Sequence, residues 1–157
     1  MWYNKYMRKI EVVRQDAIEY GQTEFKFPVR ATKNSAGYDF YSPIDVVIKP
    51  QTMEMIWSNF KAQMNSDEVL ILCVTSGMGK RGVMIANTIG VIDSDYYSNI
   101  SNDGNLGFRL YNFSNQDYVI KKGDKIGQGI FMKFLTVDDE KEITETRVGG
   151  FGSTVKK

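Results

Sequence analysis

The second half of the chain is divided into short apolar runs separated by polar and glycine-containing turns, and this pattern limits the folds open to it. Valine, isoleucine, leucine and aromatic residues fill the runs, while Gly, Asn, Asp and Ser fill the gaps. Short strands at regular spacing favour a β-sandwich or closed barrel over a parallel α/β sheet. We therefore predict an all-β domain. Its expected strands lie at 68–74, 82–86, 89–93, 106–112, 117–121 and 127–135.

The first half of the chain carries weaker strand signals. Residues 52–60 alternate apolar and polar side chains imperfectly, so we expect a strand followed by a short turn or helix there. Ala86-Asn87-Thr88 lies between two apolar runs and is expected to form the tip of a tight hairpin. Residues 1–7 receive no assignment. The other expected elements are a strand within 8–14, a loop or edge segment at 20–29, a turn at 33–37, strands at 38–41 and 44–49, and a polar loop at 98–104.

Length and charge restrict the class of protein. The 157 residues suffice for one domain with a sizeable core. Lys and Arg number 20 against 19 for Asp and Glu, and this near-balance argues against binding to nucleic acid or to a membrane surface. No apolar run approaches the ~20 residues of a membrane span, and the N-terminus lacks a signal-peptide core. We expect a cytoplasmic protein.

The chain contains no histidine and one cysteine, which restricts its catalytic chemistry. Ser-His-Asp triads and most zinc sites are excluded. Cys73 lies in an apolar run and is expected to be a small buried hydrophobe, because no histidine is present to activate it. Carboxylates, hydroxyls and backbone amides remain, with Lys or Arg for anions, and this combination suits phosphate substrates.

One aspartate stands out among the remaining candidates. Gly90-Val91-Ile92 reads as a strand that delivers Asp93 to its end, and Asp95 and Tyr96 follow closely. A carboxylate in that place can act as a general base or can make a turn hydrogen bond. The residues alone favour neither reading.

The C-terminal segment Arg147–Thr154 differs from the rest in its glycine content. Three of the four positions 149–152 are glycine, which predicts a segment that is mobile without a ligand. With its Arg, Ser and Thr it could wrap phosphate oxygens. Taken alone, a disordered terminus with no role is the favoured interpretation.

Taken together, five stretches resemble the motifs of the trimeric dUTP pyrophosphatase (dUTPase) family, in particular its phage and low-GC bacterial members. They occur in the family's order and cover the chain from about Ala31 to Thr154. The third and fifth motifs in the right order are the specific part of the resemblance. The motifs correspond to residues 36–42, 76–82, 90–96, 123–128 and 147–154.

The resemblance implies hydrolysis of dUTP to dUMP and pyrophosphate. It implies that Asp93 activates the water that attacks the α-phosphorus, and that Tyr96 packs beneath the deoxyribose and excludes a 2′-hydroxyl. It also implies Mg²⁺ carried on the substrate triphosphate, with no protein metal ligands. The remaining substrate-binding positions that it implies are Ser76, Gly77, Arg81, Asn87, Gly90, Ile92, Gln128, Arg147, Phe151, Gly152, Ser153 and Thr154.

The implied fold is a jelly-roll-like subunit. Residues 1–146 would form the β-rich domain, and residues 147–157 a flexible arm that closes over the active site. Three subunits would form a homotrimer in which each site draws on three chains and a neighbour lends the arm. Within the arm, Phe151 would stack on the uracil while Arg147 and the hydroxyls of the tail grip the γ-phosphate.

The second motif departs from the family pattern. Thr75 stands where members usually carry an arginine, and one residue is missing before Lys80. A threonine cannot supply a guanidinium to the phosphates. We expect the shorter turn to re-aim Arg81 or Lys80 into the site.

Two alternatives remain beside hydrolysis. The related dCTP deaminases share the fold but need a glutamate base, where this chain has Gly107-Phe108-Arg109-Leu110. Phage-type family members can also engage regulatory proteins, so a nucleotide-gated binder of such a partner is the second alternative. If the chain is phage-encoded, it would work in the host cytoplasm.

Overall fold

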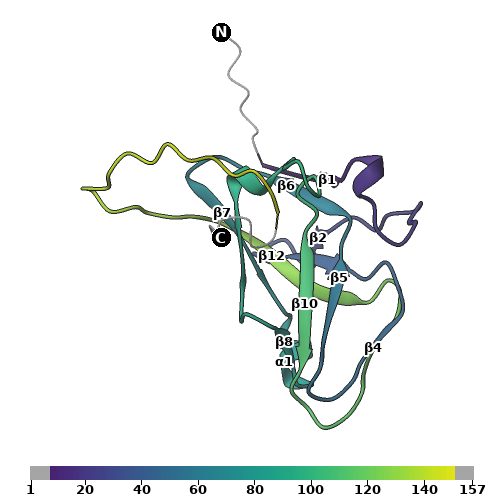
Figure 1. Ribbon diagram of the computed structural model, residues 1–157. Coiled ribbons are helices and arrows are strands. Elements are labelled where there is room, and N and C mark those ends of the chain that lie inside the picture. The colour runs from purple at the N-terminus through teal and green to yellow at the C-terminus, as the bar shows by residue number, and fades with distance from the viewer. Residues whose placement is uncertain (1–7, 151–157) are drawn as a thin grey trace.

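Residues 8–150 are the part of the chain that the computed structural model describes. The expectations for Phe151, Gly152, Ser153 and Thr154 lie outside these residues, as do residues 1–7. The described part is mostly β-structure with one short helix (Figure 1), which confirms the all-β prediction. The strands are β1 (Lys9–Val12), β2 (Val29–Arg30), β3 (Tyr38–Tyr41), β4 (Val46–Ile48), β5 (Met53–Trp57), β6 (Phe60–Gln63), β7 (Glu68–Cys73), β8 (Val83–Ile85), β9 (Gly90–Asp93), β10 (Gly107–Asn112), β11 (Tyr118–Ile120) and β12 (Lys125–Lys133). The helix is α1 (Ser76–Lys80), and two 3-10 turns lie at η1 (Gln15–Ala17) and η2 (Ser94–Tyr96).

The core lies between two antiparallel sheets. One sheet has the strand order β2-β3-β12-β7-β9 and the other the order β5-β10-β8. Phe40 of β3 and Phe108 of β10, both fully buried, bring the sheets together with ring centroids 5.3 Å apart. Two smaller pairings, β1-β6 and β11-β4, complete the domain. Buried positions alternate with half-buried ones along β7, as this two-layer packing requires.

Every strand predicted from the sequence is present, with ends shifted by a few residues. In the ambiguous segment 52–60, β5 is followed by a tight turn at Ser58-Asn59 and not by a helix. Asn59 adopts φ 64° there, a conformation that asparagine tolerates better than most residues. Strand β6 after this turn and the single-turn helix α1 were not predicted from the sequence.

The turn between β8 and β9 leads from one sheet to the other. It closes as predicted, since Ile85 and Thr88 form an antiparallel bridge and Thr88 adopts φ 72°. Beyond this bridge the strands do not continue as a hairpin. Strand β8 pairs with β10, whereas β9 pairs with β7 in the other sheet. The two sheets therefore diverge from this turn, and a space opens between them.

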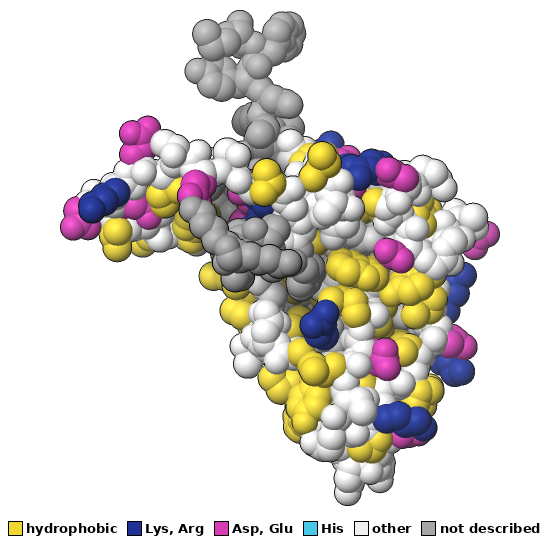
Figure 2. Space-filling model, in the orientation of Figure 1, with side chains coloured by type: hydrophobic (Ala, Val, Ile, Leu, Met, Phe, Trp, Pro, Cys, Tyr) yellow, Lys and Arg dark blue, Asp and Glu magenta, His cyan; other side chains and the backbone are white. Residues whose placement is uncertain are grey.

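After β12 the chain leaves the body as a long loop and returns at Arg147 (Figure 1). All residues from 132 to 146 are exposed. Figure 2 shows this projection with acidic and basic side chains on its surface. Within residues 8–150, no helix has the length and apolar character needed for crossing a membrane.

Candidate active site

A cavity of about 260 Å³ lies where β8 and β9 diverge. It is bounded by β7 and β9 on one side and by β8 and β10 on the other. Strand β9 contributes all four of its residues to the lining, and Leu72 and Ile85 add apolar side chains. Its lining residues are Leu72, Ile85, Asn87, Gly90, Val91, Ile92, Asp93, Tyr96, Gly107, Arg109 and Arg147.

Six of the residues predicted for the site share this cavity. Asp93 is the last residue of β9, and its carboxylate is half-exposed at the rim. Ile92, on the opposite face of the strand, is buried in the core. The pleat of β9 therefore fixes the direction of the Asp93 side chain. The six residues are Asn87, Gly90, Ile92, Asp93, Tyr96 and Arg147.

Arg147 compensates the negative charge at the cavity rim. Its Nη2 donates to Oδ2 of Asp93 at 2.7 Å, and its Nε donates to Oδ1 of Asp95 at 2.8 Å. The hydrogen bond to Asp95 is the main cause of the raised pKa of Arg147. The two negative charges add to it, while partial burial of the guanidinium acts against it. The arm thus places a cation on the candidate base.

Tyr96 closes the end of the cavity next to Asp93. It ends η2 and is 5% exposed, and its hydroxyl donates to the carbonyl oxygen of Asn105 at 2.8 Å. The same hydroxyl accepts a hydrogen bond from Nδ2 of Asn102 at 2.8 Å. Burial raises the pKa of Tyr96, so the phenol remains neutral at ordinary pH. A rigid neutral ring is suited to pack against a sugar.

The turn that holds Asn87 is fixed by its own backbone. The carbonyl oxygen of Asn87 accepts from the N–H of Ile89 at 2.9 Å and from the hydroxyl of Thr88. The N–H of Thr88 donates to the carbonyl oxygen of Ile85 at 2.8 Å. A turn held by these bonds presents backbone groups in preset directions, as reading a base edge requires.

The second group of predicted residues, Ser76, Gly77, Arg81 and Gln128, lies elsewhere. Gln128 pairs with Cys73 at the end of β7, whereas Asp93 pairs with Val69 at its start. Four residues of a strand span about 13 Å. In a single chain, the two groups therefore sit at opposite ends of β7.

Arg81 does not reach the Asp93 cavity of its own chain. Its Nη2 donates to the hydroxyl of Tyr118 at 2.5 Å, and its guanidinium carbon lies 4.5 Å from the centre of the tyrosine ring. It shares a groove of about 360 Å³ with Thr75, Gly77 and Lys125. Arg81 and Thr75, which stands at the position of the family arginine, thus line the same groove.

Gln128 packs on the first motif. A Cβ at Gly37 would lie 2.1 Å from Oε1 of Gln128, so only glycine leaves room for this amide. The amide nitrogen of Gln128 lies 3.5 Å from the carbonyl oxygen of Val74. Motifs one and four therefore meet through a direct contact of side chain on backbone.

Asp39 and Asp124, in the first and fourth motifs, make internal contacts. Nζ of Lys125 donates to Oδ2 of the buried Asp39 at 2.7 Å, and this hydrogen bond raises the pKa of Lys125. Asp124 accepts the N–H of Lys121 at 2.8 Å. Asp39 therefore ties β3 to β12, and Asp124 closes the turn before β12.

Two charged residues at or beside the cavity, Asp95 and Arg109, were given no role in the site by the sequence. Asp95 binds the arm through Arg147, and Arg109 lines the cavity from β10. In the sequence, Arg109 stands out only as a charged residue between the apolar Phe108 and Leu110, which are buried in the structure. That its strand borders the site follows from the sheet order, which the sequence does not indicate. Among residues 8–150, no three or more Asp, Glu or Cys side chains are grouped as metal ligands.

The fold and the site define a two-sheet β protein with a carboxylate and a basic arm at the rim of an inter-sheet cavity. The family model described as dUTPase matches residues 23–155. The deoxyuridine 5′-triphosphate nucleotidohydrolase of Lactococcus lactis subsp. lactis is 39% identical over 150 residues, which cover 94% of this chain and 97% of the relative. The chain belongs to the dUTPase family, and the resemblance read from its motifs is confirmed.

Solved structures agree with this assignment. The crystal structure of the dUTPase from Streptococcus mutans matches with a TM-score of 0.70 at 33% identity, covering 82% of this chain and 98% of that one. The dUTPase from phage phi11 of S. aureus matches with a TM-score of 0.68 at 22% identity, covering 89% and 97%. The phage protein shows likeness of fold alone.

Proposed function

We propose that this chain hydrolyses dUTP to dUMP and pyrophosphate with Asp93 as the general base. Hydrolysis of dUTP is the activity of the family to which it belongs. The observation that supports Asp93 is its place: a half-exposed carboxylate at the rim of the inter-sheet cavity. In a chain without histidine, a carboxylate is the base on hand at this site. Its oxygen would take the proton of the water that attacks the α-phosphorus, and pyrophosphate would leave.

The cavity would hold the nucleoside. The turn at Asn87 would pair with the uracil edge, and Gly90 and Ile92 would line the base and sugar. Tyr96 would lie beneath the deoxyribose, where its buried ring leaves no room for a 2′-hydroxyl. Arg109, on β10, adds a positive charge to the opposite wall of the cavity. An arginine in this place also disfavours the deaminase alternative, which needs a carboxylate.

The triphosphate would be held by residues of more than one chain. Ser76, Gly77, Arg81 and Gln128 are separated from Asp93 by about the length of β7. Bringing both groups to one substrate needs a second subunit, in keeping with a homotrimer. Residues 147–157 would form the closing arm, with Arg147 at the phosphates and the segment from Phe151 to Thr154 completing the site.

The dUTPase family uses Mg²⁺. We propose that the ion arrives on the triphosphate, where it would neutralise phosphate charge. The donor set of this chain fits that role, because Asp93 and Asp95 are engaged by Arg147 and the described residues offer no carboxylate cage. Calorimetric titration of the protein with Mg²⁺ alone should then give no binding heat. A titration with dUTP and Mg²⁺ together, using an inactive variant, should give a clear one.

The proposal is tested with Asp93→Asn, which keeps the shape and removes the base. We expect turnover of dUTP to fall by about 10²–10⁴ while affinity for the nucleotide is kept. Asp45→Asn, at an exposed carboxylate paired with Lys121, is the control. Unchanged turnover in Asp93→Asn would remove Asp93 from the role of base.

A regulatory role remains a separate proposal. Staphylococcus bacteriophage 80alpha dUTPase, 22% identical to this chain, belongs to a group of phage dUTPases described as controlling the transfer of virulence genes. If this chain binds a regulatory protein in the cytoplasm, the Asp93→Asn variant should lose hydrolysis of dUTP and still bind that protein. If Asp93→Asn loses both hydrolysis and binding of the regulatory protein, the binding depends on the catalytic site.

A further inference from the structure

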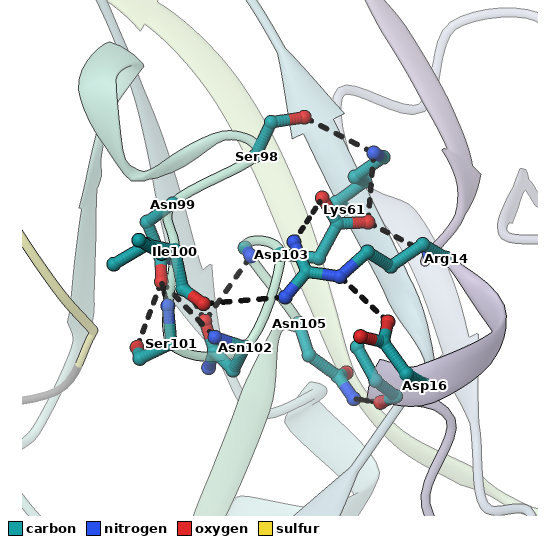
Figure 3. A network of polar contacts seen from close by, with 12 residues as sticks. Arg14, Asp16, Lys61, Ser98, Asn99, Ile100, Ser101, Asn102, Asp103 and Asn105 are labelled. Atoms are coloured by element: carbon teal, nitrogen blue, oxygen red, sulfur yellow. Dashed lines mark hydrogen bonds and ion pairs between the residues drawn. The ribbon is translucent and has the colours of Figure 1, made fainter.

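The loop Ser98–Gly104, here called the asparagine loop, is more ordered than its polar sequence indicates (Figure 3). Oδ1 of Asn99 accepts hydrogen bonds from the N–H of Ser101 at 3.0 Å, from its hydroxyl at 2.8 Å and from the N–H of Asn102 at 3.1 Å. Asp103 and Gly104 adopt φ 59° and 85°, which close the loop. One side chain thus organises the whole turn.

The asparagine loop is fixed to the body of the protein by a buried ion pair. Oδ2 of Asp103 accepts from Nζ of Lys61 at 2.8 Å and from the N–H of Arg14 at 2.7 Å (Figure 3). The side chains of Asp103 and Lys61 are 4% and 11% exposed. Paired charges at this depth hold the loop to β6 and to the segment before η1.

The orientation of the Asn102 side chain follows from this frame. Its Oδ1 accepts from the N–H of Gly104 at 3.1 Å and from Nδ2 of Asn99 at 2.8 Å. The carbonyl end is therefore occupied by donors, and Nδ2 is directed to the hydroxyl of Tyr96 at 2.8 Å. A flipped amide would place two donors against the Gly104 and Asn99 donors.

The hydroxyl of Tyr96 is consequently held from two sides. It accepts from Asn102 and donates to the carbonyl oxygen of Asn105, both at 2.8 Å. The space behind the tyrosine backbone is also closed, since a Cβ at Gly104 would lie 2.8 Å from its carbonyl oxygen. The phenol end of the ring cannot shift without breaking one of these contacts.

The asparagine loop also touches the arm. The N–H of Gly150 donates to the hydroxyl of Ser101 at 2.8 Å. A Cβ at Gly150 would lie 2.9 Å from that hydroxyl, so the arm backbone packs directly on the loop. One loop therefore contacts both the cavity wall and the segment proposed to close it.

We propose that Asn102 is a positioning residue for sugar specificity, because it fixes the Tyr96 ring as the wall that excludes a 2′-hydroxyl. This inference rests on the proposed role of Tyr96. Without the Asn102 donor, the ring can move away from the cavity and leave space for ribose. Small displacements of this kind change rates strongly. The asparagine loop thus acts on selectivity from outside the cavity.

The test compares dUTP and UTP as substrates of the full-length protein. In Asn102→Ala and in the isosteric Asn102→Asp, we expect the ratio of kcat/KM for dUTP to that for UTP to fall about tenfold. Most of the change should come from a gain in UTP turnover. Tyr96→Phe, which removes the hydroxyl and keeps the ring, should lower the ratio to a similar extent. In the double variant Tyr96→Phe with Asn102→Ala the ratio should fall no further than in Tyr96→Phe, because that change already removes the hydroxyl to which Asn102 donates.

Asn112→Ala is the matched control. Asn112 is buried and donates to the carbonyl oxygens of Ile48 and Gln116, far along β10 from the cavity. It should lower the melting temperature and leave the dUTP/UTP ratio unchanged. A ratio that stays at the wild-type value in a folded Asn102 variant, or that falls equally in Asn112→Ala, would overturn the proposal.

Tyr96→Ala separates this inference from the proposed function. If Tyr96→Ala loses selectivity and both Asn102 variants keep it, Tyr96 is the sugar wall but Asn102 does not position it. If Tyr96→Ala also keeps selectivity, the proposed role of Tyr96 itself is wrong.

Discussion

Arg147 joins the two aspartates at the rim of the cavity, with its Nη2 2.7 Å from Oδ2 of Asp93 and its Nε 2.8 Å from Oδ1 of Asp95. The arm's cation therefore sits on the carboxylate that is proposed to activate water. If Asp93 is the base and Arg147 binds the substrate, as proposed, the guanidinium would pass from Asp93 to the triphosphate and free the carboxylate to bind water. Substrate binding and base release would then be one event.

Replacing Arg147 with alanine should raise the KM for dUTP about tenfold or more, since a charge-assisted hydrogen bond to phosphate contributes about 1.5–3 kcal/mol. Arg147→Lys should give an intermediate value, because lysine keeps the charge and loses the fork of two donors. Steady-state kinetics with dUTP measure both. Lys49→Ala, which breaks the exposed pair with Asp117, should leave KM unchanged. Equal KM values for wild type and Arg147→Ala would show that Arg147 serves only the resting contact.

Gly37→Ala should weaken substrate binding through Gln128. The new Cβ would meet Oε1 of Gln128 at 2.1 Å, and this flexible end can swing away without unfolding the protein. We expect KM for dUTP to rise about tenfold with a small change in melting temperature. Gln128→Ala should show the same rise, and combining both changes should add little. Additive effects would mean that Gly37 acts by another route.

Mixed oligomers should show whether a neighbour lends the arm. Residues 132–146 are exposed, so the arm could exchange between subunits and keep its contacts at Arg147 and Gly150. Co-expressing Asp93→Asn with Arg147→Ala should then restore about a quarter of wild-type activity, the share of sites that combine both intact residues. Each variant alone is the control. No recovery would mean that the arm serves the site of its own chain.

Acid should destabilise the protein in part through Asp103. Burial alone would raise the pKa of this carboxyl, but the hydrogen bonds from Lys61 and from the Arg14 N–H, with the charges of both residues, lower it below its ordinary value of 3.8. A lowered pKa gives stability that is present above the unfolded-state pKa and is lost as the pH falls through the folded-state value. Asp103→Asn should therefore cost about 3 kcal/mol at neutral pH, or about 6–12 °C in melting temperature. The gap between the two proteins should narrow below about pH 4.

Melting temperatures recorded from pH 7 to pH 3 check this expectation. Asp67→Asn breaks the exposed pair with Lys133 and should leave the melting temperature close to that of the wild type at every pH. A gap between wild type and Asp103→Asn that stays constant down to pH 3 would contradict the assignment.

Strand positions could be predicted from the sequence because period-two alternation and turn residues are local signals. Strands β7 to β12 appear where the apolar runs lie. The pairing of those strands could not be predicted in this way. Nothing local in 82–93 indicates that β8 and β9 join different sheets, because that choice is made by contacts with β10 and β7. Strand β6 was missed because Asn59 turns the chain within a segment that reads as one element.

The candidate site was predictable where motif and cavity coincide. Asp93, Tyr96 and Asn87 lie close in sequence, and their shared cavity follows from one turn and one strand. Arg109 and Asn102 were missed because their roles depend on cross-strand and loop contacts that leave no motif of their own. The predicted role of Arg81 in phosphate binding stays a prediction, because within its own chain Arg81 donates to the hydroxyl of Tyr118.

The divergence of β8 and β9 gives the cavity one wall from each sheet. A nucleotide that contacts Ile92 on one side and Arg109 on the other would link the two sheets non-covalently at the point where they separate. Amide hydrogen exchange should then slow on both walls together when nucleotide binds, although the walls share no strand. The region where the two sheets separate would then be stabilised by the bound nucleotide.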